Sequence, residues 1–262
     1  MPLSTPLDPL CAIVCGFEKS GTTLLNEILR RHPALDSGHE VGVFLGTSPK
    51  EFSSHQPYYA FFRKSWRLSR DQMQYVCDTE DWGTFYCRAR ELSPLIADKN
   101  VWLFDKTPIY MRYLDDVLSK AVDIPCIVNV RDPRALMHSW ANWSGHRDNP
   151  AAWLEENFEA NCDRFLNYAR GYDRARRAYG SRLLLNRFED LCLNPIQHLE
   201  RIFAFIGLAF DQEYLRFESE HFVYGNTVSD SYIFAYRNSF SKALCEKILR
   251  ATMEYEDWHY HG

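Results

Sequence analysis

A glycine-containing loop near the start of the chain has the residue types that bind anions. The stretch IVCGFEKSGTTLL, residues 13–25, joins an apolar run to a helical pattern, with Gly16 and Gly21 between them. Backbone N–H groups at a helix N-terminus attract anions, and glycines let the backbone curl closely around one. The loop also carries an ammonium group and three hydroxyls, from Lys19, Ser20, Thr22 and Thr23. The sequence therefore predicts an anion site, and the alternative is a tight turn with a surface lysine.

The order of residues in this loop differs from that of nucleoside-triphosphatases. Their pattern is GxxxxGK[ST], in which the lysine follows the second glycine. Here Gly16 and Gly21 have the required spacing, but Thr22 stands at the lysine position and Lys19 lies upstream. The Ser/Thr position that usually holds a metal ion is displaced as well, so the bound anion should be of another kind.

A second motif, NVRDPRALMHSW at 129–140, places Arg131 just after another apolar run and Ser139 within the following helical pattern. An arginine at the carboxyl end of a strand can grip a phosphate with its planar fork. Ser139 can reach the same oxygens if the helix runs back over the site. Taken alone, the motif has a second interpretation, in which Arg131 and Asp132 are only a surface ion pair. Together with the first loop, they indicate one ligand with two separated anionic ends.

Apolar runs that alternate with helical patterns must position these residues. Predicted strands span 11–16, 101–105, 125–130 and 182–188, and predicted helices span 22–31, 134–143, 152–179 and 196–206. This alternation predicts an α/β fold, a single three-layer domain over 1–262 with a mainly parallel central sheet and a P-loop-like strand–loop–helix. Ligands bind at the carboxyl ends of such strands, so Lys19, Asp105-Lys106 and Arg131 should converge at one edge. The stretch 50–90 fits least well, and we interpret it as a lid or an acceptor-side insertion.

In combination, KSGTT and R-D-P-R-x4-S strongly resemble the sulfotransferase family that uses 3′-phosphoadenosine 5′-phosphosulfate (PAPS). The resemblance implies that the loop 19–23 cradles the 5′-phosphosulfate and that Arg131 and Ser139 hold the 3′-phosphate. It implies that Lys19 neutralises the oxygen bridging phosphorus and sulfur as the S–O bond breaks. A sulfuryl group carries less charge than a terminal phosphoryl group, so we expect no metal ion.

Two weaker matches extend the resemblance from about residue 11 to about residue 226. The stretch RFEDLCLNP, 187–195, resembles the family's YEDL…P element, and FIGL follows it at 205–208. Phe188 then occupies the position of the tyrosine that stacks on adenine. The stretch HFVYGN, 221–226, resembles an H-x3-GN element of bacterial members, but the arginine that usually follows is missing. Arg237 is the candidate to replace it on the 3′-phosphate.

The acceptor's proton must be removed by a base, and the resemblance favours Glu40 in SGHEVGVF, 37–44. The adjacent His39 stays an alternative, and His138 beside Ser139 is a weaker one. Chemistry alone favours a solvated loop carboxylate for Glu40, and only the resemblance favours the base.

The stretch FDKTPIY, 104–110, resembles the F-x-K-[ST]-P-x-Y element of the same branch. The resemblance implies that Lys106 approaches the transferring sulfonate, with Asp105 as a reserve base or orienter and with Thr107 and Tyr110 shaping the site. The alternative for Asp105 is an ordinary ion pair at the strand end.

The expected activity is in-line transfer of a sulfuryl group from PAPS to a hydroxyl, or to a nitrogen, of a small molecule or sugar. The product would be 3′,5′-adenosine bisphosphate (PAP). The alternatives are a P-loop kinase for a metabolite or nucleotide, and an inactive nucleotide-binding module. Aromatic candidates for the acceptor cavity are Tyr58, Tyr59, Phe61, Phe62, Trp66, Trp82 and Trp143.

Composition limits the partners. A formal net charge of −5 argues against general attraction to nucleic acid or to an anionic membrane, so positive charge must be concentrated locally.

No stretch approaches the ~20 apolar residues of a membrane span, and the N-terminus lacks the features of a signal peptide, so we expect a cytoplasmic protein. The eight cysteines include no CxxC pair, and those in apolar runs, Cys11, Cys15 and Cys126, are expected to be small buried hydrophobes instead of zinc ligands or disulfide partners. His259 and His261 are expected to belong to a polar tail. The sequence leaves the oligomeric state open.

Overall fold

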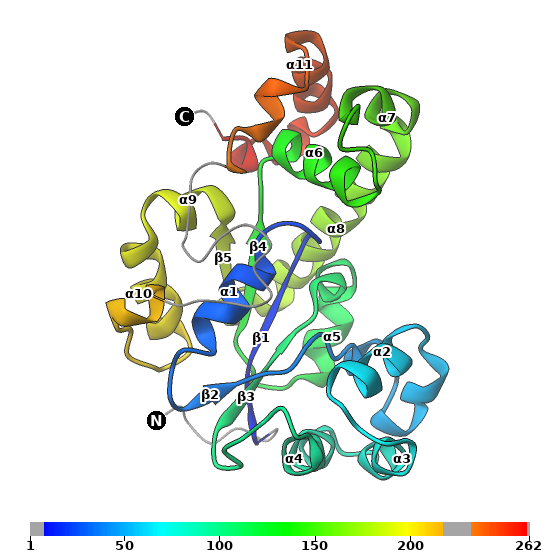
Figure 1. The fold of residues 1–262 in the computed structure, drawn as a ribbon, viewed down its shortest axis with the longest axis vertical. Coiled ribbons are helices and arrows are strands. Elements are labelled where there is room, and N and C mark those ends of the chain that lie inside the picture. Colours follow the sequence, from blue (N-terminus) through cyan, green and yellow to red (C-terminus); the bar gives the residue numbers. More distant parts are fainter. Residues whose placement is uncertain (1–7, 217–231, 261–262) are drawn as a thin grey trace.

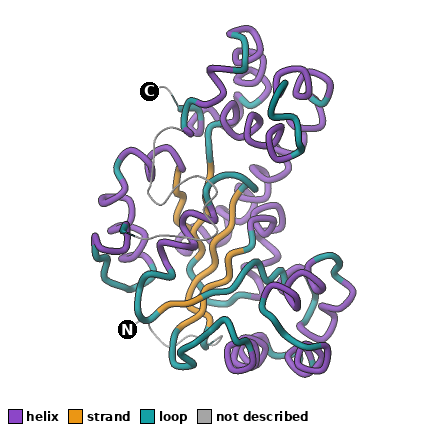
Figure 2. The backbone as a smooth tube through the Cα atoms, in the orientation of Figure 1, coloured by secondary structure: helices purple, strands orange, loops and turns teal. Residues whose placement is uncertain are grey.

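The computed structural model describes residues 8–216 and 232–260, and a five-stranded parallel sheet lies at its centre (Figure 2). The strands are β1 (Leu10–Gly16), β2 (Leu35–Asp36), β3 (Trp102–Lys106), β4 (Cys126–Val130) and β5 (Leu183–Arg187), in the order β2-β3-β1-β4-β5. Every neighbouring pair is parallel. Since β1 lies between β3 and β4, the carboxyl ends of these three strands share one edge, where ligands bind in such folds.

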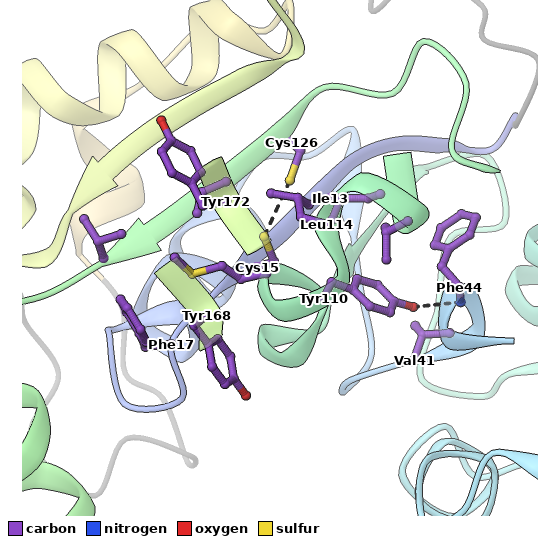
Figure 3. Close-up of a cluster of buried hydrophobic side chains, with 14 of the residues drawn as sticks. Ile13, Cys15, Phe17, Val41, Phe44, Tyr110, Leu114, Cys126, Tyr168 and Tyr172 are labelled. Carbon is purple, nitrogen blue, oxygen red and sulfur yellow. Dashed lines mark hydrogen bonds between the residues drawn. The ribbon is translucent and has the colours of Figure 1, made fainter. Parts of the chain in front are cut away.

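Helices cover both faces of the sheet, as the predicted three-layer α/β fold requires (Figure 1). One face is covered by α1 (Thr22–Leu29), α9 (Phe188–Leu193) and α10 (Pro195–Phe205), and the other by α5 (Leu114–Lys120) and α8 (Phe158–Tyr179). Side chains of β1 alternate between the two cores: Val14 packs with the first group, and Ile13 and Cys15 with the second (Figure 3). The sheet is therefore buried on both sides, and the fold prediction is confirmed.

Two further groups of helices flank the sheet, one at each end of the molecule in Figure 1. One comprises α2 (Tyr58–Ser65), α3 (Arg70–Cys77) and α4 (Trp82–Leu92), and the other comprises α6 (Pro133–Trp143), α7 (Pro150–Glu156) and α11 (Lys242–Ala251). Short 3-10 helices connect them, among them η1 (Val43–Leu45), η2 (Pro49–Ser54), η3 (Pro108–Tyr113), η7 (Ala235–Asn238) and η8 (Met253–Trp258). No helix of the two described ranges combines the length and apolar character needed to cross a membrane.

The stretch 50–90 is helical and well packed. Its aromatic side chains Phe52, Phe62 and Phe85 are fully buried against one another, with ring centroids 5.5–6.2 Å apart. A role of this stretch as a lid or in acceptor binding stays a prediction.

Two of the differences between predicted and observed boundaries bear on the site or on the helix layer. The helix predicted over 152–179 is two helices, because Asn157 has φ −114° and ψ 21° and its side-chain amide donates to the Trp153 carbonyl at 2.8 Å. The strand predicted to reach Phe188 ends at Arg187, and Phe188 begins α9.

Candidate functional site

A cavity of about 310 Å³ follows the carboxyl ends of β1 and β4 and brings the two predicted anion-binding motifs together. It is lined by Lys19, Gly21, Thr22, Thr23, Leu24, Arg131, His138, Ser139, Asn142, Phe188, Cys192, Tyr232 and Ala235. Lys19 and Arg131 are 112 positions apart in the sequence, yet they line the same space. The geometry therefore supplies two cationic groups for one ligand.

The loop after β1 is held by the neighbouring strand. Gly16 has φ +148°, and a Cβ there would lie 2.2 Å from the Asn129 carbonyl oxygen, so no larger residue fits. The Ser20 hydroxyl donates to the carbonyls of Phe17 at 2.7 Å and Asn129 at 3.1 Å. It is fully buried and absent from the cavity lining, so its hydroxyl fixes the loop instead of facing the ligand as expected.

Positive charge is concentrated at Lys19. Its backbone is left-handed, with φ 75°, which is rare for a residue other than glycine and is found often at functional sites. The pKa of Lys19 is lowered mainly by partial burial and then by the nearby charges of Arg131 and Arg147. An anion bound here would relieve this repulsion. The acidic chain thus has the local cationic site that its sequence requires.

Phe188 contributes an aromatic ring to the lining of the same cavity. Gly21 begins α1 with φ +86°, and a Cβ there would lie only 2.3 Å from the Phe188 ring. The Arg131 guanidinium lies 4.5 Å from the centroid of the same ring. The ring therefore lies beside both the Gly21 turn and Arg131, and as a lining residue it is placed to contact a planar group in the cavity.

Arg131 is fixed by backbone groups from distant parts of the chain. Its Nη1 donates to the Lys19 carbonyl at 2.9 Å, and its Nη2 donates to the Tyr232 carbonyl at 2.7 Å. Behind it, the Asp132 amide donates to the buried Glu189 carboxylate at 3.0 Å. Burial raises the pKa of Glu189 to about 7, and the charge of Arg131 partly offsets that rise.

Arg237 does not reach the cavity. Its guanidinium lies 3.8 Å from the centroid of the Phe234 ring, and its side chain is exposed. The same segment contributes Tyr232 and Ala235 to the lining instead. Because Arg237 is not a lining residue, the expectation that it binds the 3′-phosphate finds no geometric support. The predicted element at 221–226 lies outside the described residues.

The predicted base and the predicted second lysine form an ion pair. Lys106 Nζ lies 3.2 Å from Glu40 Oε1, with the lysine side chain 3% exposed and the glutamate side chain 29% exposed. His39 is exposed, and its ring packs edge-on against Phe61 at 5.5 Å between centroids. The structure thus brings Glu40, but not His39, into contact with Lys106.

Asp105 is an anchor within the protein. It is fully buried and accepts hydrogen bonds from Thr107 Oγ1 at 2.6 Å, Tyr86 Oη at 2.6 Å and Tyr110 Oη at 2.9 Å. Burial raises its pKa to about 6, although the three hydroxyl donors oppose this shift. A carboxylate enclosed in this way orients its neighbours and has no route to an acceptor.

The hydroxyls that donate to Asp105 in turn hold the loop of Glu40. Thr107 Oγ1 accepts hydrogen bonds from the amides of Val41 and Gly42, each at 3.1 Å. Tyr110 Oη accepts one from the Phe44 amide at 3.2 Å (Figure 3). Three successive contacts therefore fix the backbone that follows Glu40.

Glu18, directly before Lys19, is a second carboxylate on this side that the sequence analysis did not single out. It accepts hydrogen bonds from Tyr168 Oη and, at 3.1 Å, from Arg164. Tyr58 is half-buried nearby, and its pKa is raised to about 12 by burial and then by the charges of Glu40 and Glu18. Two ion-paired carboxylates thus face one tyrosine. The only signal for Glu18 in the sequence was that it directly precedes Lys19.

The cavity lining also includes Asn142 and Cys192, which the sequence motifs did not predict, and His138, which was only a weaker candidate for the base. His138 and Asn142 lie on the same face of α6 as Ser139, a spacing that could have identified them. Cys192 follows Phe188 by one helical turn. His259 is not in an exposed tail, because it is 5% exposed and its Nε2 lies 2.9 Å from Thr252 Oγ1. His261 lies outside the described residues.

In the described part of the chain, the cysteines form no disulfide and the potential metal ligands form no cluster. Cys15 and Cys126 Sγ atoms lie 3.6 Å apart on adjacent strands, and burial raises the pKa of Cys15 far above its ordinary value. All eight cysteines are free thiols. Across 8–216 and 232–260, no three His, Cys, Asp or Glu side chains are grouped as metal ligands.

Comparisons with known proteins agree on one family and one fold. A family model described as "Sulfotransferase family" matches residues 12–212. The sulfotransferase domain of the Synechococcus PCC 7002 olefin synthase is 20% identical, with a TM-score of 0.66 over 100% of this chain and 98% of that one. The sulfotransferase domain from the curacin biosynthetic pathway is 20% identical, with a TM-score of 0.61 over 94% and 97%. Sulfotransferase STF9 from Mycobacterium avium is 15% identical, with a TM-score of 0.56 over 97% and 77%. No curated protein matches significantly.

Proposed function

The chain belongs to the sulfotransferase family, and on that basis we propose that it transfers a sulfuryl group from PAPS to a small acceptor and releases PAP. One observation carries the proposal: Lys19, Arg131 and the Phe188 ring line a single cavity, and the Arg131 guanidinium lies 4.5 Å from the centroid of that ring. PAPS has a phosphosulfate at one end, a 3′-phosphate at the other and a planar adenine, which matches these three features. The P-loop kinase is not favoured, because the family match points to another class of transferase.

The residues present fit this donor. The amides at the start of α1 and the Lys19 ammonium would hold the phosphosulfate, and Arg131 with Ser139 would hold the 3′-phosphate. Thr22 and Thr23 would add hydroxyl donors beside Lys19. A volume of about 310 Å³ is within the range of pockets that enclose small ligands.

The reaction that we propose breaks the bond between sulfur and the phosphate oxygen while the acceptor oxygen or nitrogen bonds to sulfur. Lys19 stabilises the charge left on the phosphate oxygen. Glu40 takes the proton of the acceptor group. Lys106, whose Nζ lies 3.2 Å from Glu40 Oε1, would contact the sulfonate during transfer.

We propose an acceptor with a hydroxyl or a nitrogen on a small molecule or sugar. The carboxylates of Glu18 and Glu40 near Tyr58 support an acceptor that donates hydrogen bonds, and they oppose a polyanionic acceptor. A cytoplasmic location is part of the same proposal.

A thermal-shift comparison of PAP with ATP, GTP and 5′-AMP tests the donor class. We expect the largest increase in melting temperature with PAP, because only PAP places phosphates at both cationic ends. Arg131→Ala should remove most of this preference, whereas Arg177→Ala, at an exposed position of α8, should keep it. An equal or larger shift with ATP or GTP would refute PAPS as the donor.

A further inference from the structure

His138 lies in α6 one position before Ser139, and its side chain lines the same cavity as Arg131. The imidazole is about nine-tenths buried. Its Nε2 lies 3.3 Å from Ser239 Oγ, and its Nδ1 lies 3.5 Å from Asn142 Nδ2. Since Asn142 Nδ2 is a donor, Nδ1 accepts and Nε2 carries the proton, which is the neutral tautomer.

The end of the cavity near Arg131 has less permanent positive charge than its proposed ligand needs. A phosphate monoester carries about −1.5 to −2 charges at neutral pH. Arg131 supplies one positive charge, and Arg237 is outside the lining. Lys19 belongs to the other end of the proposed donor. Among the lining residues that the structure describes, the remaining one that can become a cation beside Ser139 is His138.

We propose that His138 is a specificity residue for the 3′-phosphate, and that it supplies a second positive charge to that end only while the nucleotide is bound. This inference rests on the proposed function, because it assumes a 3′-phosphate beside Arg131. In the free protein, burial and the charge of Arg131 lower the pKa of His138, so the ring is neutral near pH 7. A phosphate dianion in the cavity acts in the opposite direction and favours the imidazolium. Binding should therefore take up a proton.

The surroundings of His138 leave two groups that could take up this proton. Arg131, from the loop after β4, is the charged side chain that shifts the pKa of His138. Asn142 on α6, and Ser239 and Phe240 after η7, contact the ring and carry no charge. Glu189, on the other side of Arg131, has a pKa raised to about 7 and could also respond to a bound phosphate.

Calorimetric titrations with PAP and 5′-AMP at pH 6 and pH 8, in buffers of different ionisation heat, separate these cases. The protein forms to compare are the wild type, His138→Gln, Glu189→Gln and His146→Gln. His146 is a matched control, because it is an exposed histidine that stacks on Trp153 outside the cavity. The phosphates of PAP titrate identically in every titration, so differences among the proteins come from the protein groups.

If phosphate binding raises the pKa of His138 by about one unit, the wild type should gain about two- to sixfold in PAP affinity over His138→Gln between pH 8 and pH 6, because the full tenfold gain is reached only below both the free and the bound pKa. His146→Gln and Glu189→Gln should keep that gain. The affinity for 5′-AMP, which lacks the 3′-phosphate, should differ little between the wild type and His138→Gln at either pH. Proton uptake with PAP should be reduced in His138→Gln alone.

The outcomes distinguish this inference from the proposed function. If the wild type does not prefer PAP to 5′-AMP, the proposed donor is wrong. If it prefers PAP but His138→Gln follows the wild type at both pH values, only the role of His138 is refuted. Loss of the pH-dependent gain in Glu189→Gln, with His138→Gln unchanged, also refutes it and assigns the proton to Glu189. If His138→Gln does not fold, His138→Asn allows the same comparison.

Discussion

Replacing Thr107 by valine should loosen the loop that carries Glu40 without changing side-chain volume. Thr107 Oγ1 donates to Asp105 at 2.6 Å and accepts from the amides of Val41 and Gly42, each at 3.1 Å. Valine has the same shape but makes none of these hydrogen bonds. Two buried N–H groups and one carboxylate oxygen would then lose a partner.

The expected cost follows from this count. Leaving one buried polar group without its hydrogen bond costs about 1–3 kcal/mol, so with three groups affected we expect Thr107→Val to lower the free energy of unfolding by at least about 3 kcal/mol. This loss in the free energy of unfolding, relative to the wild type, should depend on pH. The pKa of Asp105 is about 6 in the folded protein against an ordinary 3.8, so the folded state binds its proton more tightly, and stability falls as pH rises through this window. Without the Thr107 donor the ionised carboxylate is stabilised less, so the loss should be larger at pH 8 than at pH 5.

Urea unfolding at both pH values measures the stability, and hydrogen exchange of the Val41 and Gly42 amides measures the loop directly. Thr107→Ser is the matched control, because it keeps the hydroxyl and loses one methyl group, at a cost of about 1 kcal/mol. We expect faster exchange of the two amides in the valine variant alone. If Thr107→Val is as stable as Thr107→Ser, and its amides remain equally protected, Asp105 and Thr107 do not hold this loop.

Three further predictions concern the cavity and the base. Lys19→Ala should fold normally and lose about 10²–10³ in transfer rate from radiolabelled PAPS to a panel of alcohols, phenols and amines; transfer at the wild-type rate would contradict its role. Glu40→Gln should lower turnover by about 10²–10⁴ with PAP affinity retained, and loss of turnover in His39→Ala alone would move the base to His39. Gly21→Ala should lower both the free energy of unfolding and the free energy of PAP binding, by about 1–3 kcal/mol each, because its Cβ would lie 2.3 Å from Phe188. Gly145→Ala is the control, since Gly145 also has positive φ, at +92°, but nothing lies within 4 Å of its added Cβ; an equal effect of the two substitutions would rule out the Phe188 contact as the cause.

The elements around the sheet could be predicted because their sequence signals are local. The run at β1 is continuously apolar, since neighbouring residues such as Ile13 and Val14 pack into cores on opposite faces. The stretch 50–90 gave a weak signal for a physical reason. Phe52, Phe62 and Phe85 meet one another from separate helices, so their burial does not follow the period of any one helix.

The candidate site was predictable where a motif is contiguous and unpredictable where partners are distant. The cavity includes Lys19 and Arg131, as their motifs suggested. The burial of the Ser20 hydroxyl depends on the Asn129 carbonyl, 109 positions away, which no local pattern encodes. Likewise, only the packing of α6 against the segment after η7 determines that His138 lines the cavity while Arg237 stacks on Phe234.

The two hydrogen bonds that Arg131 donates to main-chain carbonyls have a consequence for engineering. The guanidinium connects residue 19 to residue 232, so any substitution of Arg131 disturbs the connection between these two segments as well as removing or moving the charge. An attempt to make the protein bind another nucleotide than the proposed donor should therefore leave this arginine in place. Changes at Phe188 and Cys192, whose side chains line the cavity from α9, offer a route that keeps this link intact.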